Sequence, residues 1–125
     1  MAKLHVGRPM KPPKGFRTDL KLLGRNVRVR YVTSIRIGRG KLDGYIDTNK
    51  FEIIVACWGR HRQTVADSIW HELIHLILYY ARTDHCEEAF INPEVEEGLT
   101  LTLEAGQGAL LRDNTWLRET FNNGR

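Results

Sequence analysis

Residues 64–81 read TVADSIWHELIHLILYYA, and this stretch decides the fold because its apolar residues have the spacing of one helix. On a helical wheel they form a single stripe, which consists of Val65, Ile69, Leu73, Leu76, Ile77 and Tyr80. Thr64 is a candidate N-cap, and Asp67 three residues later nearly completes a capping box. Further apolar residues lie off the stripe, so little of the circumference is polar. We therefore predict a helix at the centre of the domain, ending near Ala81.

The stretch ahead of this helix alternates apolar and charged residues, as strands do. Residues 26–37 predict one bent strand or two short strands. After a turn at Asp43-Gly44, residues 45–57 predict a hairpin. We therefore expect a small antiparallel or mixed sheet of about three strands, packed on the helix.

A second helix is predicted further along the chain. Asn92 is a candidate N-cap and Pro93 suits the first helical position, so this helix should reach about Leu111. A short amphipathic turn at Trp116 and Leu117 is expected to close the chain. The predicted fold class is therefore α+β, with a small N-terminal sheet packed on a central helix and a second, C-terminal helix.

The length of 125 residues allows one domain. Residues 1–17 contain three prolines and several basic residues, which predicts an extended or mobile arm ahead of a single domain over residues 18–125. Apolar residues are 42% of the chain and charged residues 27%, and this composition excludes a disordered or collagen-like polymer.

The lengths of the apolar runs and the number of cysteines indicate the cellular compartment of the protein. No apolar run reaches the ~18–20 residues of a membrane span. The first residues also lack the apolar run of a secretory signal. Two cysteines, Cys57 and Cys86, cannot form a disulfide framework, so we expect small buried thiols. These features predict a cytoplasmic protein with no membrane contact.

The motif that carries chemistry is His71-Glu72-Leu73-Ile74-His75. Residues four apart on a helix share one face, so His71 and His75 can bind one zinc ion while Glu72 projects beside it. The alternative is that both histidines are hydrogen-bonded core groups. The motif predicts one Zn²⁺ per chain on His71 and His75, with Glu72 as general base toward a zinc-activated water.

A catalytic zinc ion usually has three protein ligands, and no histidine lies at the downstream spacing of the longer HExxHxxGxxH motif. Residues 94–97, which read EVEE, are the natural source of the third ligand. The apolar periodicity of the second helix places Glu96 at the edge of its stripe and favours Glu96. His85 and Cys86 are rival ligands.

Charge is unevenly divided along the chain. Residues 1–62 hold 15 of the 19 Lys+Arg and 4 of the 15 Asp+Glu, a net +11, whereas residues 63–125 are net −7. Basic residues that neutralise phosphates supply non-specific affinity for nucleic acid. Interleaving such as Arg28-Val29-Arg30-Tyr31 is, however, also the pattern of a solvated strand face. We therefore expect either a weak nucleic-acid contact through the basic N-terminal half or a solvated face.

Three stretches resemble the small zinc metallopeptidases encoded by phages and integrated elements: IWHELIHLIL at residues 69–78, the acidic residues 94–97, and LLRDN at residues 110–114. Those enzymes are similar to the minimal domains of SprT-like and ImmA/IrrE-like peptidases, and the resemblance covers about residues 26–114. It implies a small α+β domain with two histidine ligands, a catalytic glutamate and a downstream glutamate ligand. Counting back from LLRDN aligns that ligand with Glu97. The chain departs from the family at Gly98, where another acid is common.

These features together predict a zinc-dependent metallopeptidase, a hydrolase that cleaves peptide bonds in a protein substrate. Residues 51–57 are expected to form an open sheet edge that binds an extended peptide. The donor to the oxyanion is expected among His61, Tyr79, Tyr80 and His85. The alternative is a zinc-stabilised binding module whose basic N-terminal half contacts nucleic acid or a partner protein.

Overall fold

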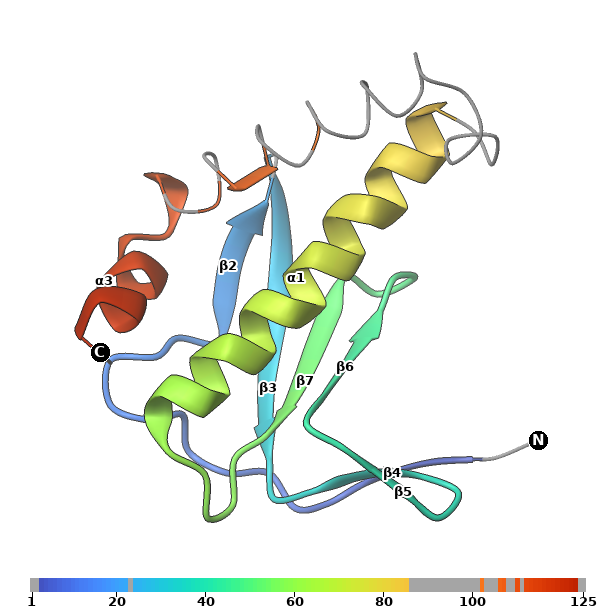
Figure 1. The fold of residues 1–125 in the computed structure, drawn as a ribbon, viewed down its shortest axis with the longest axis vertical. Helices are drawn as coiled ribbons and strands as arrows, with labels where there is room; N and C mark the ends of the chain where they lie inside the picture. The colour runs from blue at the N-terminus through green and yellow to red at the C-terminus, as the bar shows by residue number, and fades with distance from the viewer. Residues whose placement is uncertain are drawn as a thin grey trace.

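The computed structural model describes residues 3–22, 24–85 and 112–123, together with residues 102, 106, 107 and 110. In these residues seven strands form two sheets, and two helices accompany them. The predicted α+β class is therefore confirmed. Figure 1 shows the long helix lying diagonally across one face of the larger sheet, with two strands of the smaller sheet near the ends of the larger sheet's central strands.

The larger sheet is mixed. Its strands lie in the order β2-β3-β7-β6, with bounds Asp19–Leu22, Arg25–Val32, Glu52–Ala56 and Gly44–Asp47. β3 and β7 are parallel, whereas the two outer pairs are antiparallel. The predicted hairpin is confirmed as β6–β7, with Asp47 opposite Glu52. All residues of β7 are buried, as expected for a central strand.

The smaller sheet has no counterpart in the expectation from sequence. It contains β1 (Leu4–Val6), β4 (Ile35–Ile37) and β5 (Gly40–Leu42), all antiparallel, in the order β1-β4-β5. The described strands outnumber the expected three, because strands of three or four residues are too short to show an alternation of their own. Residues 26–37 contribute to two strands, β3 and β4, one in each sheet.

The predicted arm, residues 1–17, packs against the domain where the structure describes it. β1 pairs with β4, and Pro9 forms an isolated bridge with Val32. The Phe16 side chain is buried in the main core, where its ring lies edge-on to the Tyr31 ring at 6.2 Å. These contacts make the arm part of the packed unit rather than a free extension.

Helix α1 spans Arg62–His85 and begins two residues before the predicted cap at Thr64. The N-cap is His61: its carbonyl accepts a hydrogen bond from Val65 N–H, and its Nδ1 accepts one from Gln63 N–H, both at 3.1 Å. The predicted apolar stripe is confirmed for its described side chains, which are at most 1% exposed: Val65, Ile69, Leu73, Leu76 and Ile77. Neither helix in the described residues has the length and apolar character needed to cross a membrane.

The main core lies between α1 and the larger sheet, and Leu110 and Leu117 add to it. Leu110, which falls in the predicted second helix, is fully buried. Gly106 lies so close to α1 that an added Cβ would come within 3.0 Å of Ile77 Cδ1. A larger residue at this position would require the Ile77 side chain to shift. The predicted start of the second helix at Asn92 lies outside the described residues.

Cys57 is a buried free thiol, as predicted. Its Sγ donates to the Val55 carbonyl at 3.6 Å, and burial raises the pKa of this thiol to about 11. Since the thiolate is the reactive form, a raised pKa makes Cys57 unreactive and favours a structural role. Cys86 lies outside the described residues.

Asn114 joins the C-terminal segment to the outer edge of β2. It stands just before helix α3 (Thr115–Asn123), which corresponds to the predicted amphipathic turn. Its Oδ1 accepts from Lys21 N–H at 2.7 Å, and its Nδ2 donates to the carbonyls of Lys21 at 2.6 Å and Leu110 at 2.9 Å. The side-chain amide thus pairs with β2 as a further strand would.

Asn114→Ala is expected to lower the free energy of unfolding by about 2–3 kcal/mol, because it removes all three side-chain hydrogen bonds, two of them to the part-buried backbone of Lys21. Urea unfolding of the metal-free protein measures the loss. Asn26→Ala is the matched control, since Asn26 is exposed and its substitution should change stability by less than about 0.5 kcal/mol. Equal effects of both substitutions would contradict the edge contact.

Candidate metal centre

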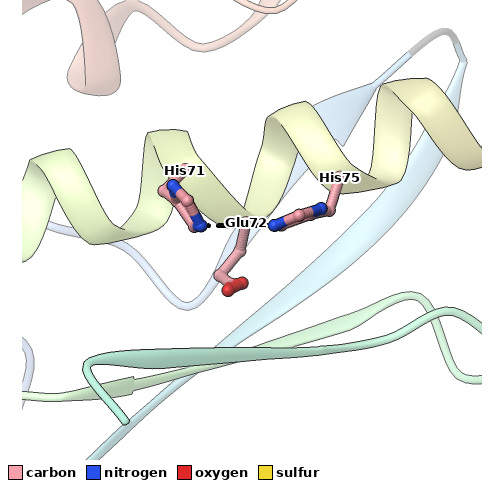
Figure 2. Close-up of side chains that lie close together, drawn as sticks. All are labelled: His71, Glu72 and His75. Atoms are coloured by element: carbon pink, nitrogen blue, oxygen red, sulfur yellow. Dashed lines mark hydrogen bonds between the residues drawn. The ribbon is translucent and has the colours of Figure 1, made fainter.

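His71 and His75 project from the exposed side of α1, and their imidazoles converge (Figure 2). The two Nε2 atoms are 3.2 Å apart, within hydrogen-bond distance, and the ring planes meet at 77°. Two nitrogens bound to one tetrahedral zinc ion at about 2.0–2.1 Å would lie about 3.3 Å apart. The separation of the imidazoles therefore fits a shared zinc ion.

Glu72 lies between the two histidines, and its side chain points from α1 toward the neighbouring strand (Figure 2). The residue is 7% exposed, and its Oε2 has no hydrogen-bond partner among the described residues. Burial raises the pKa of this carboxyl, against the opposing effect of His75 and His71. One ligand atom from each of the three residues lies within 4.8 Å of the others. A buried carboxylate oxygen without a partner is costly, and a metal ion or water nearby would satisfy it.

The three side chains line a cleft of about 770 Å³ between α1 and the chain from β5 to β6. Gly44, the first residue of β6, faces Glu72 directly: an added Cβ would lie 3.0 Å from Glu72 Cγ and 3.4 Å from Cδ. No larger residue fits there without moving the carboxylate. Glycine at this position therefore allows β6 to cover Glu72 while the cleft stays open.

Gly44→Ala is expected to lower the free energy of unfolding by about 1–2 kcal/mol, because the new methyl group overpacks against Glu72. In a Glu72→Ala background Cγ and Cδ are absent, so most of this cost should disappear. Urea unfolding of the four proteins in this double-mutant cycle measures the coupling. The same cost in both backgrounds would contradict a direct contact.

Arg60 fixes the width of the cleft at the end where α1 begins. Its guanidinium donates to the carbonyls of Ala56 at 2.6 Å, Asp43 at 3.2 Å and Thr64 at 3.2 Å, and to Ser68 Oγ at 2.7 Å. One side chain thus joins the end of β7, the segment between β5 and β6, and the first turns of α1. These bonds fix the position of the start of β6 relative to α1, the helix that carries Glu72.

Of the residues considered as the third zinc ligand, the structure describes only the backbone of His85. Glu96 and Glu97 lie outside the described residues, as does the rival Cys86. His85 ends α1, ten residues after His75, and a rise of about 15 Å separates the two backbones. The His85 side chain lies outside the described part of the chain, so its role as a rival ligand stays a prediction.

The helical rise also sets the distance between the imidazoles and the residues predicted to donate to an oxyanion. His61 caps α1 ten residues before His71, about 15 Å away, and its Nδ1 already accepts a hydrogen bond. His61 therefore lies too far from the imidazoles to donate to an oxyanion there, and the His85 side chain lies outside the described residues. Tyr79 is 37% exposed and lies one turn beyond His75 on the same side of α1, so it remains a candidate. The Tyr80 side chain lies outside the described part of the chain.

The expected open edge at residues 51–57 is wrong. β7 pairs with β3 on one side and β6 on the other, so it lies inside the sheet. The edge strand beside the histidines is β6. A single sequence could not rank these strands, because the β3–β7 pairing joins segments with three other strands between them.

Two residues of the site carry no signal in the sequence. Gly44 belongs to an Asp-Gly pair that is typical of a turn, and Arg60 is one basic residue among many. Comparisons of the chain with protein-family models, with curated proteins and with solved structures find no match. The side chains of the site therefore carry the functional argument, and two imidazoles with a carboxylate are a donor set that suits zinc.

Proposed function

We propose that the protein is a zinc-dependent metallopeptidase that hydrolyses peptide bonds in a protein substrate. The observation that supports this most is the pair of imidazole nitrogens 3.2 Å apart beside a buried carboxylate with an oxygen lacking a partner. A closed structural zinc site needs ligands only, whereas a hydrolytic site also needs a base beside the ion. Glu72 has the position and the burial of such a base.

In this proposal His71 and His75 hold the zinc ion, and Glu96 or Glu97 is the third protein ligand. Bound zinc supplies Lewis acidity, which polarises the scissile carbonyl and lowers the pKa of water. Glu72 accepts the proton of the attacking water and delivers it to the leaving amine. Burial favours this cycle because it raises the pKa of the carboxyl, which then holds a proton more readily.

The substrate lies in the cleft as an extended chain. Among the described residues no strand pairs with the outer edge of β6, so its backbone groups can bind a peptide by strand addition. The width set by Arg60 then places the peptide between β6 and α1, next to Glu72. We set this activity in the cytoplasm, where a free thiol such as Cys57 persists.

Two variants, Glu97→Gln and Glu96→Gln, test the third ligand. We expect the variant that removes this ligand to bind zinc at least about 100-fold more weakly, and the other variant to bind it nearly as well as the parent. Competition with a chromophoric chelator measures both affinities side by side. Two unaffected variants would contradict the assignment and direct attention to Glu94.

The proposed function is tested with the full chain purified without added metal. We expect about one zinc per chain by elemental analysis and slow cleavage of an unfolded protein such as reduced casein. A chelator should stop cleavage, and stoichiometric zinc should restore it. Full cleavage by the metal-free chain would overturn the proposal.

A further inference from the structure

The outer face of the smaller sheet carries a row of basic side chains. His5 on β1 is directly opposite Arg36 on β4, and Arg36 is directly opposite Lys41 on β5. All three residues are exposed, whereas four neighbours on these strands belong to or pack against the second core cluster: Leu4, Val6, Ile35 and Leu42. We call these residues, His5, Arg36 and Lys41, the basic row.

The basic row is not neutralised. Among the residues that the structure describes, no carboxylate forms an ion pair with any member of the row. Arg28 and Arg30 on the larger sheet differ, because Glu52 lies 3.9 Å and 3.1 Å from their guanidinium groups. Arg36 and Lys41 carry like charges directly opposite one another, which destabilises a sheet, so the row favours an anionic partner.

The basic row also reaches the cleft, since Lys41 is one of the residues that line it. Lys41 precedes Gly44 by three residues, which span at most about 10 Å of extended chain, and Gly44 contacts Glu72. Arg36 and His5 follow at about 4.8 Å for each further strand. An extended peptide that passes Glu72 and leaves the cleft over Lys41 therefore crosses the whole row.

We propose that the basic row selects substrates with acidic side chains on one side of the scissile bond. This inference rests on the proposed function. At about 3.3 Å per residue, the acidic positions lie roughly three to six residues from the bond that is cleaved. A nucleic acid fits less well, because the exposed positions of β1, β4 and β5 carry no Phe, Tyr or Trp on which bases could stack.

The experiment compares three fluorescein-labelled probes by anisotropy: a 12-residue peptide with alternating glutamates, the same peptide with glutamines, and a 12-nucleotide single-stranded DNA. The protein is the full chain with Glu72→Gln, so that no probe is cleaved. The test variant adds Arg36→Glu and Lys41→Glu. The control adds Lys21→Glu and Arg118→Glu, which change net charge equally at exposed positions away from the row.

The glutamate peptide should bind the test variant at least about tenfold more weakly, and the control within about threefold of the parent. Arg36→Gln with Lys41→Gln should give an intermediate affinity, which excludes a folding defect caused by charge reversal. Equal losses in test and control variants, or equal affinity for the glutamine peptide, would overturn the inference. Tighter binding of the DNA that depends on the same residues would overturn it too.

Hydrolysis by the chain with Glu72 intact is scored separately. Row-dependent binding of the glutamate peptide without any hydrolysis would reject the proposed function and leave the acidic-peptide surface in place. Hydrolysis, together with binding of the glutamate peptide that substitutions in the basic row leave unchanged, would reject this inference alone.

Discussion

Glu72→Gln is expected to reduce hydrolysis by about 10²–10⁴-fold while zinc content stays at about one per chain. The amide keeps the shape of the side chain but cannot accept the proton of the attacking water. The substitution should not lower the free energy of unfolding of the metal-free protein. Burial raises the pKa of Glu72, so its charged form is disfavoured in the fold and a neutral amide is tolerated.

The measurement is cleavage of an unfolded protein by zinc-loaded samples at equal zinc occupancy. Gln63→Ala is a suitable control, because Gln63 lies in the first turn of α1, away from the imidazoles, and its loss should leave the rate unchanged within about twofold. Equal cleavage by Glu72→Gln and the parent would remove Glu72 from the mechanism. It would also favour a zinc-stabilised binding module, which has no need of this carboxylate.

His71→Ala and His75→Ala are each expected to reduce zinc affinity at least about 100-fold, so that protein purified without added metal contains almost none. Each substitution leaves two protein ligands, which bind the ion far more weakly than three. Both side chains are exposed, so the metal-free proteins should unfold at nearly the urea concentration of the metal-free parent. Elemental analysis and chelator competition give the two quantities.

His61→Ala is the matched control for these substitutions. It removes a histidine from the same helix, but one that caps the N-terminus about 15 Å from His71. We expect unchanged zinc content and a loss of about 1 kcal/mol in the free energy of unfolding, the usual value of an N-cap. Full zinc content in His71→Ala and His75→Ala would place the ion elsewhere in the chain.

Patterns within short stretches of the sequence were sufficient to predict the features that depend only on residues close together in the chain. The apolar spacing of residues 64–81 predicted the buried stripe of α1, and the pattern of residues 45–57 predicted the β6–β7 hairpin. The spacing of His71 and His75 predicted their shared face, because i and i+4 positions on a helix always meet.

Features that depend on distant segments could not be predicted in this way. β1 pairs with β4 across the whole of β2 and β3, and three-residue strands carry no periodicity of their own. Gly44 faces Glu72 from 28 residues away, and only the packed sheet brings them together. The cap at His61 was missed because an imidazole seldom replaces the short polar side chains that favour this position.

The bond between Asn114 and Lys21 also bears on self-association. The amide occupies the outer edge of β2, so among the described residues the larger sheet can be extended only along β6. Two copies of the chain that join edge to edge through this sheet would therefore meet over the cleft and cover Glu72. Dimerisation of that kind would compete with peptide binding, because both would use the same edge of β6.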